Sequence, residues 1–297
     1  MATTIRGRQT RSKVCDPCDN AEKPGIDGSV SWPHRSGRRS GLATVSAVSD
    51  SPEDQGPILA VVTGASRGIG AGIAAAATAD GSVVAVCNRS ASDFERQLTV
   101  DLSRPESWPE FATWFDKLVD DVAPAQIVAI HNAATLTPIG FAGEVDAEGY
   151  TSNVLLNSAA PQVVGDAIIR TARCATTPTV LVQLSSGAGK NPYPGWTSYC
   201  ASKAAVDMWV RSVGLEQADR NDLVRALSIS PGVVATAMQA EIRTSDSDAF
   251  PDVERFQDLH DDDHLADPAE VGATIWQIAR SETWANGTVG DLSLMRS

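Results

Sequence analysis

The 297-residue sequence lacks long hydrophobic runs and lacks a surplus of positive charge. None of its apolar runs approaches the roughly 18 residues that a membrane-spanning helix needs, and its start lacks the apolar segment of a secretory signal. Residues 1–56 carry eight Lys and Arg against seven Asp and Glu, out of 24 and 37 in the whole chain. Residues 57–297 therefore hold 16 basic against 30 acidic residues, a net charge near −14. We expect neither nucleic acid nor an anionic membrane as the main partner.

Cysteine is also scarce, and the five present are Cys15, Cys18, Cys87, Cys174 and Cys200. An odd, scattered set without an export signal is typical of reduced thiols, so we expect a cytoplasmic protein. Cys15 and Cys18 form a lone C-x-x-C, but a zinc site needs a second ligand pair and the nearest candidate is His34 alone. The segment HDDDH at 260–264 contains ligand types, yet a solvated acidic turn is the favoured interpretation. We predict no metal site.

Residues 1–56 are rich in Arg, Ser, Thr, Gly, Asp and Pro and show neither helical nor strand periodicity. They cannot bury enough apolar surface to offset the entropy of ordering, which predicts a disordered tail. The start MATTIRGRQTRSK is faintly similar to a transit peptide. RSGRR at 35–39 suggests a basic interaction arm, which the near-zero charge of the tail disfavours. A dispensable tail, or a start codon assigned too far upstream, is the preferred interpretation.

From residue 57 onward, short β-branched runs alternate with longer helical patterns. The expected strands lie at 58–63, 82–87, 126–131, 179–184 and 224–229. Ala-rich or amphipathic stretches separate them, among them 67–79, 105–119, 145–172 and 198–216. Continuous apolar strands are typical of a parallel sheet covered on both faces, and strand–helix alternation indicates right-handed βαβ units. The prediction is a single α/β domain at 57–297, doubly wound in the Rossmann manner around a parallel sheet.

A glycine-rich loop joins the first expected strand to the first helix, in VVTGASRGIGAGIAAAA. Gly64, Gly68 and Gly70 follow the spacing G-x-x-x-G-x-G. Glycines here allow a tight turn and a close approach of the backbone to a pyrophosphate, while the helix N-terminus offers free N–H groups. A glycine turn without a ligand is the alternative, which the order strand, loop and helix disfavours. The loop therefore predicts a dinucleotide site.

The residues after the second strand indicate which nicotinamide cofactor binds. An acid about 20 residues past such a loop usually bonds the ribose 2′-OH of NAD. This sequence has Asn88 and Arg89 there instead. A guanidinium matches a 2′-phosphate, and Arg67 in the glycine loop can supply a second positive charge. Either arginine alone can be a solvated surface residue, but together they favour NADP(H).

Tyr199 and Lys203 lie four residues apart in SYCASK and so share one face of an expected helix. A free tyrosine, with a pKa of about 10, is a weak acid, and a nearby ammonium lowers that pKa. Ser186 stands just past the end of the strand expected at 179–184, where its hydroxyl can bond a carbonyl oxygen. An ordinary amphipathic helix is the alternative. The position at the carboxyl ends of the strands, where open α/β sheets bind ligands, favours a proton-transfer site.

At these positions the sequence resembles the short-chain dehydrogenase/reductase family. TGASRGIG matches the family's cofactor loop, HNAA its N-A-G motif, YCASK its Y-x-x-x-K motif and SPGVVAT its P-G-x-x-x-T segment. Asn153 in SNVLL matches the asparagine of the catalytic tetrad, and Asp101 with Leu102 stands where the family contacts adenine. Ala134 departs from the motif glycine, which narrows the pocket without removing chemistry. The matches run in order from residue 57 to the C-terminus.

The resemblance implies a role for each matched residue. Tyr199 is the general acid in reduction, Lys203 lowers its pKa and holds the nicotinamide ribose, and Ser186 orients the carbonyl. Asn153 anchors a water that links Lys203 to solvent. The cofactor set is Gly64, Ser66, Arg67, Gly68, Ile69, Gly70, Asn88, Arg89, Asp101, Leu102, Asn132, Ala133, Tyr199, Lys203, Val234 and Thr236. In that set, Val234 and Thr236 hold the carboxamide and Asn132 packs near the riboses. A homodimer or homotetramer is expected.

The C-terminal part indicates the substrate. Residues 236–294 are similar to the sepiapterin reductase and benzil-reductase-like members of the family, which implies a small planar carbonyl substrate. Asp291 stands where sepiapterin reductase anchors a pterin, although an aspartate on the last strand can also be structural. Tyr193 and Trp196 can line the approach with flat apolar surface or merely pack the loop. A 3-oxoacyl-thioester reductase, another alcohol dehydrogenase of the family, or a non-catalytic NADP-binding protein are the alternatives.

Overall fold

The computed structural model describes residues 56–220 and 223–292. The predicted tail, apart from Gly56, and the cysteines Cys15 and Cys18 lie outside these residues. Within them, parallel strands form one sheet in the order β3-β2-β1-β4-β5-β6-β7. The strands are β1 (Ile58–Thr63), β2 (Val83–Asn88), β3 (Arg96–Thr99), β4 (Gln126–His131), β5 (Thr179–Leu184), β6 (Val224–Ser230) and β7 (Val289–Asp291). The predicted doubly wound parallel sheet is confirmed.

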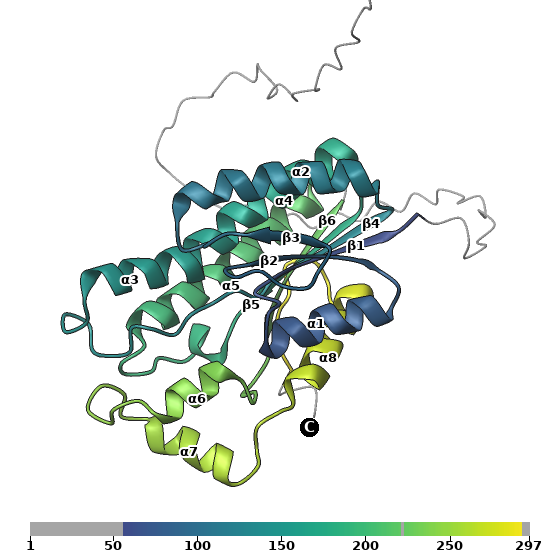
Figure 1. Cartoon of the computed structure of the whole chain (residues 1–297). Helices are drawn as coiled ribbons and strands as arrows, with labels where there is room; N and C mark the ends of the chain where they lie inside the picture. The colour runs from purple at the N-terminus through teal and green to yellow at the C-terminus, as the bar shows by residue number, and fades with distance from the viewer. Residues whose placement is uncertain (1–55, 221–222, 293–297) are drawn as a thin grey trace, which may run out of the picture. The chain divides into compact units, whose positions relative to one another are not determined.

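Helices cover both faces of this sheet (Figure 1). They are α1 (Gly68–Ala79), α2 (Trp108–Val122), α3 (Ala147–Val154), α4 (Ala160–Ala175), α5 (Thr197–Ala218), α6 (Ala237–Arg243), α7 (Val253–Asp261) and α8 (Pro268–Arg280). In β1, Ala60 and Val62 join the core beneath α1 and α8, whereas Leu59 and Val61 join the core beneath α2, α4 and α5. Successive side chains of a strand point to opposite faces, so a strand buried on both sides is apolar throughout.

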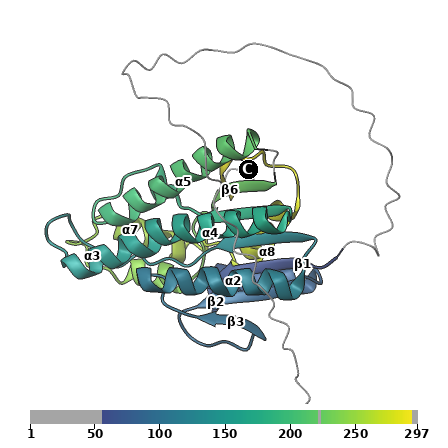
Figure 2. The ribbon, with the colours of Figure 1, turned by 90° about the horizontal axis from the view of Figure 1, so that it is seen from above.

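The expected strands and helices agree with the structure to within a few residues, with three differences. No bounds were predicted for strands β3 and β7, because one is a partly exposed edge strand of four residues and the other spans only three. The expected helix at 145–172 is two helices, α3 and α4, separated by a π-helical turn at Leu155–Ala159. Figure 2 shows α2, α4 and α5 side by side over one face of the sheet.

Helices α1 and α8 pack unusually close together because glycines meet at their crossing. A Cβ on Gly272 would lie 2.5 Å from the backbone of Gly72, and a Cβ on Gly72 would lie 2.6 Å from the carbonyl oxygen of Pro268. Neither helix can carry a side chain at this point without moving its partner. This crossing fixes α1, and with it the glycine loop that precedes α1.

A third apolar cluster lies at the carboxyl ends of the strands, where α6 and α7 pack (Figure 1). Its buried residues are Leu136, Ala188, Trp196, Tyr199, Ile242, Phe250, Val253 and Phe256. The strand order reverses between the neighbours β1 and β4, because the chain runs outward from β1 to β2 and β3 on one side and from β4 to β5 and β6 on the other. Ligands of open α/β sheets bind at such a switch point.

Among the helices of the described residues, none is long and apolar enough to cross a membrane.

Candidate active site

The glycine loop adopts the conformation that close approach of a phosphate requires. Gly64 and Gly68 have φ values of +69° and +57°, which side chains rarely adopt. A Cβ on Gly70 would lie 2.2 Å from the carbonyl oxygen of Gly64, so the first turn of α1 packs directly on the loop. Helix α1 begins at Gly68 and leaves its first N–H groups free to face a ligand. This cradle fits a pyrophosphate.

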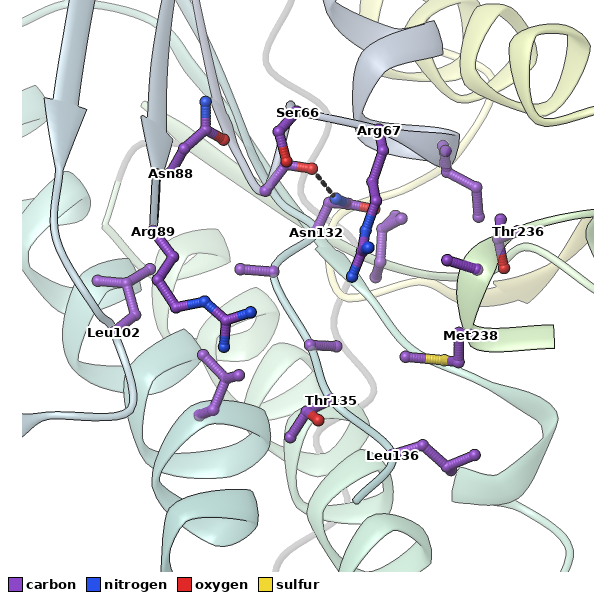
Figure 3. Close-up of a pocket in the computed structure, with 18 of the residues that line it drawn as sticks. Ser66, Arg67, Asn88, Arg89, Leu102, Asn132, Thr135, Leu136, Thr236 and Met238 are labelled. Atoms are coloured by element: carbon purple, nitrogen blue, oxygen red, sulfur yellow. Dashed lines mark hydrogen bonds between the residues drawn. The ribbon is translucent and has the colours of Figure 1, made fainter. Parts of the chain in front are cut away.

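Two asparagines hold the loop in place. The side chain of Asn132 donates to the carbonyl oxygens of Thr63, at 3.1 Å, and Gly64, at 2.9 Å (Figure 3). The side-chain oxygen of Asn88 accepts a hydrogen bond from the N–H of Ala65 at 2.8 Å. Both asparagines were predicted to contact the cofactor, and both line the same cavity. Their hydrogen bonds show that they also shape the loop on which a cofactor would lie.

A cavity of about 570 Å³ opens beside the loop and is lined by the predicted cofactor residues, apart from Gly70 and Val234. Figure 3 shows Arg67, from the loop, and Arg89, after β2, extending their side chains into this cavity. Asp101 and Leu102 line the same region. Burial raises the pKa of Asp101, but hydrogen bonds from Ser103 and the charges of Arg89 and Arg104 outweigh burial and lower it. The cavity therefore combines a phosphate cradle with three basic side chains, Arg67, Arg89 and Lys203, and with the carboxylates of Asp101 and Glu241, which suits a dinucleotide.

Tyr199 and Lys203 line this cavity, and Ser186 lies within hydrogen-bonding reach of Tyr199. Ser186 follows β5 and caps a short 3₁₀ turn, where its hydroxyl accepts a hydrogen bond from Ala188 at 3.2 Å. Tyr199 and Lys203 lie in the first two turns of α5, and both are buried. The ammonium of Lys203 donates to the carbonyl oxygen of Leu184 at 2.8 Å. The i, i+4 geometry expected from the sequence thus places both groups against the end of β5.

The pKa values of the two buried groups shift in opposite directions. Burial raises the pKa of Tyr199 to about 12, and a hydrogen bond with Ser186 partly offsets the rise. Burial lowers the pKa of Lys203 to about 8, and Asp207 partly restores it. The net direction for Tyr199 is the opposite of the lowering predicted from Lys203. The reason is that the Lys203 ammonium bonds Leu184 and lies 5.6 Å from the centre of the Tyr199 ring, so burial dominates.

Asn153 lies at the end of α3, just before the π-helical turn, and is fully buried. Its side chain donates to the carbonyl oxygen of Thr137 at 2.9 Å and accepts from Asn157 at 2.9 Å. Asn157 in turn bonds Thr135 in both directions. The side chain of Asn153 is therefore occupied by bonds to the loop after β4 and to Asn157. A water that links Lys203 to solvent would have to bind the main chain near Asn153 instead of its side chain. Asn157 was not predicted, although its spacing of four from Asn153 placed it on the same helical face.

A second cavity, of about 320 Å³, adjoins the first, and Tyr199 lines both. The second cavity is also lined by Ser186, Val234, Thr236 and the three candidate substrate residues Tyr193, Trp196 and Asp291. The ring of Trp196 stacks on Phe250, with centroids 4.4 Å apart, and meets the edge of Tyr199 at 6.0 Å. The structure thus places aromatic walls on one side of the reacting groups and a carboxylate on another.

Arg255 and Gln239 also line this second cavity, and neither was predicted. The guanidinium of Arg255 donates to the hydroxyl of Tyr193 at 3.4 Å and lies over its ring at 5.9 Å. Gln239 is buried and donates to the carbonyl oxygen of Phe256 at 3.2 Å. Nothing in the local sequence distinguishes these two residues from surface positions of short helices, because their place depends on how α6 and α7 pack.

Within the described residues, no group of three or more His, Cys, Asp or Glu side chains is arranged to hold a metal ion. The acidic segment 260–264 is among the described residues, whereas Cys15 and Cys18 lie outside them.

Three similarities to known proteins agree with this geometry. The sequence model of the family described as short chain dehydrogenase matches residues 59–247. The benzil reductase ((S)-benzoin forming) of Bacillus subtilis (strain 168) is 35% identical over 239 residues, which cover 79% of this chain and 98% of that protein. The sepiapterin reductase of Meriones unguiculatus is 27% identical over 266 residues, covering 78% of this chain and 95% of that protein.

The crystal structure of the KRED1-Pglu enzyme superposes with a TM-score of 0.65 at 27% identity, over 78% of this chain and 99% of that one. The family model spans more than half of the chain, and the Bacillus subtilis relative matches nearly end to end. The chain therefore belongs to the short chain dehydrogenase family of oxidoreductases.

Proposed function

We propose that this chain is an NADPH-dependent carbonyl reductase that reduces one carbonyl of a small vicinal dicarbonyl or side-chain diketone. The observation that carries the proposal is the position of Tyr199, which lines both the cofactor cavity and the aromatic cavity beside it. A phenol at this boundary can reach the oxygen of a carbonyl whose carbon faces a nicotinamide. When bound, NADPH supplies the hydride.

The residues of the chain supply the rest of the chemistry. The hydroxyl of Ser186 bonds the carbonyl oxygen and orients the substrate, and Tyr199 donates the proton that converts the oxyanion to an alcohol. Lys203 binds the nicotinamide ribose and offers a positive charge beside the phenol. Asn153 shapes the loop after β4 through its side chain, and its main chain, just before the π-helical turn, would hold the water that connects Lys203 to solvent. Val234 and Thr236 hold the carboxamide; both line the second cavity, and Thr236 also lines the first.

The preference for NADPH rests on Arg67 and Arg89. Both line the cofactor cavity, and Arg89 follows Asn88 at the place where an acid would bind the ribose of NAD. A 2′-phosphate between two guanidinium groups forms charge-assisted hydrogen bonds, whereas NADH offers them no anion.

The dicarbonyl substrate is supported by the shape of the second cavity and by the two kinds of relative. Its volume of about 320 Å³ suits a small molecule, and Trp196, Tyr193 and Phe256 give it flat apolar walls. Two relatives are named for the reduction of benzil and of sepiapterin, and each of these compounds is a ketone attached to a conjugated ring. Asp291 lines the cavity and would bind the polar edge of a pterin.

A panel of carbonyl compounds tests the proposal through the NADPH consumed. It contains sepiapterin, benzil and acetoacetyl thioesters, with NADH as the second cofactor. We expect turnover of at least one of the first two compounds with NADPH. Turnover of the thioesters alone would favour a 3-oxoacyl-thioester reductase, and no turnover of any compound despite NADPH binding would favour a non-catalytic protein.

Asp291→Ala then separates the two dicarbonyl classes. We expect it to weaken sepiapterin turnover far more than benzil turnover, because only the pterin has an edge that bonds a carboxylate. Equal losses for both would make Asp291 a structural residue.

The proposal includes a cytoplasmic homo-oligomer, either a dimer or a tetramer. Exposed apolar side chains on the outer faces of α4 and α5 support self-association: Val163, Met208 and Leu215, the last of which is 75% exposed. Light scattering after size exclusion measures the oligomeric state directly.

A further inference from the structure

Two buried polar side chains lie side by side behind the candidate active site. His131 ends β4 and Gln183 lies in β5, and the two are register partners in neighbouring parallel strands. They are 4% and 1% exposed. Register partners point to the same face of a sheet, here the face covered by α4 and α5. The side-chain nitrogen of Gln183 donates to the carbonyl oxygen of Pro161 in α4 at 2.9 Å. This bond orients the amide group, so the side-chain oxygen of Gln183 points away from Pro161.

Neither side chain is satisfied by the described residues. Both ring nitrogens of His131 and the side-chain oxygen of Gln183 are buried without a hydrogen-bond partner there. A neutral imidazole has one donor and one acceptor, and buried polar groups are nearly always paired. The N–H group of the neutral His131 ring can donate to the side-chain oxygen of Gln183, which satisfies both of these atoms. The other ring nitrogen of His131 is an acceptor, and it still needs a donor.

Lys203 is a candidate for that donor. Its buried ammonium has three N–H groups, and one of them bonds the carbonyl oxygen of Leu184, the residue that follows Gln183. The charge of Lys203 acts on the His131 ring: burial, and then that charge, lower the pKa of His131 to about 3. A ring that stays neutral keeps a nitrogen free to accept.

We propose that His131 is a positioning residue for Lys203, accepting a hydrogen bond from its ammonium while donating one to the side-chain oxygen of Gln183. The inference rests on the proposed function, since it assigns a support to the lysine of that site. The chain Pro161, Gln183, His131 and Lys203 would then connect α4 to the ammonium through two strands. The other titratable groups that face Lys203 are Asp207 and Tyr199, both on its own helix.

Nitrogen NMR of the imidazole rings tests this arrangement without any substrate. The chain has four histidines, and the His131 signals are those that disappear in His131→Asn. We expect His131 to remain neutral and in one tautomer between about pH 5 and 8. Lys203→Met should shift its unprotonated nitrogen, and Gln183→Leu its protonated one. A His131 ring that titrates near the ordinary value of about 6.5, or that ignores Lys203→Met, would overturn the proposal.

The pH dependence of NADPH binding and of turnover gives a second measurement. The ammonium is needed for both, so activity falls as pH rises through the pKa of Lys203, which lies near 8. Removing an acceptor disfavours the ammonium and lowers that pKa further. His131→Leu should therefore move the alkaline limb of kcat/KM down by about one pH unit, while His131→Asn, which retains an acceptor, restores most of it.

A purely structural role of His131 gives a different pattern. In that case His131→Leu and His131→Asn would both lose activity or stability while the alkaline limb of kcat/KM stayed at the same pH, and that result would contradict the proposal. The two failures are distinguishable. If no carbonyl compound is reduced, the proposed function fails, whereas the ring signals and the pH dependence of NADPH binding still decide the role of His131. If His131→Leu does not fold, Gln183→Leu and the spectrum of the unaltered chain decide it.

Discussion

The proton of Tyr199 is held more tightly than the proton of a free phenol, because burial raises its pKa to about 12. The acid is therefore fully protonated at any working pH, which suits the direction of reduction. Transfer of that proton then depends on what stabilises the tyrosinate left behind. Ser186 is bonded to the phenol, and the Lys203 ammonium lies 5.6 Å from the ring. A ligand that draws Lys203 from Leu184 toward the phenol would strengthen its effect.

Tyr199→Phe removes the proton donor and keeps the ring that packs against Trp196. We expect kcat to fall by about 10²–10⁴-fold, the usual contribution of general acid catalysis, while the Kd for NADPH changes little. Steady-state kinetics and fluorescence titration of NADPH measure the two quantities. Tyr193→Phe is the matched control, since it removes a hydroxyl from the same cavity without removing the acid. Near-normal turnover of Tyr199→Phe would mean that another group donates the proton.

Arg89→Asp tests the cofactor preference. The change removes a partner of the 2′-phosphate and introduces the acid that would bind the ribose hydroxyl, so the ratio of kcat/KM for NADPH over NADH should reverse. The control is Arg96→Asp, because Arg96 lies on β3 and is not among the residues that line the cofactor cavity. An unaltered enzyme that already prefers NADH would contradict the assignment of both Arg67 and Arg89.

At the residue scale, the sequence predicted the site residues whose relative positions depend on neighbours close in the chain. The glycine spacing and the Tyr-x-x-x-Lys pair depend on short-range geometry, and the structure places them as expected. Arg255 escaped prediction because its contact with Tyr193 crosses 62 positions of the chain. The second role of Asn88, as a partner of Ala65, crosses 23 positions and was missed for the same reason.

At the scale of elements, apolar periodicity identified the buried strands well and the exposed or interrupted elements poorly. Strands β1, β4 and β5 have the predicted bounds because each is buried almost throughout. The π-helical turn at 155–159 leaves no signature in hydrophobic spacing, so the segment 145–172 resembles one long helix. The interruption lies directly after Asn153, where the loop that follows β4 is fastened.

The crossing of α1 and α8 offers a test of how packing supports the cofactor loop. In Gly272→Ala the new Cβ would lie 2.5 Å from the backbone of Gly72, so the helices must separate. We expect a loss of about 1–3 kcal/mol in the free energy of unfolding, measured by urea denaturation, together with weaker NADPH binding as α1 shifts. Gln277→Ala, at an exposed position of α8, is the control for the substitution itself. Unchanged stability of Gly272→Ala would show that the crossing is loosely packed.

At the scale of the whole molecule, periodicity alone predicts alternating strands and helices but no strand order. The order β3-β2-β1-β4-β5-β6-β7 depends on contacts between segments far apart in the chain, and it was not predicted. That order places the glycine loop, Asn132 and Ser186 at one edge, after β1, β4 and β5. The position of the site is therefore a consequence of topology, whereas residues of α6 and α7 form walls of the second cavity.

A chain that begins at Gly56 tests the predicted division between residues 1–56 and 57–297. Every element and every site residue discussed above lies at or beyond Ile58. The removed segment is nearly neutral, so the truncated chain keeps the acidic charge of the rest. We expect kcat/KM and the Kd for NADPH to stay within about twofold, and Tm to change by less than the 2–4 °C that about 1 kcal/mol would cause in a domain of this size. Insoluble protein, a larger fall in Tm or lost turnover would show that the first 55 residues contribute to the fold or to the site.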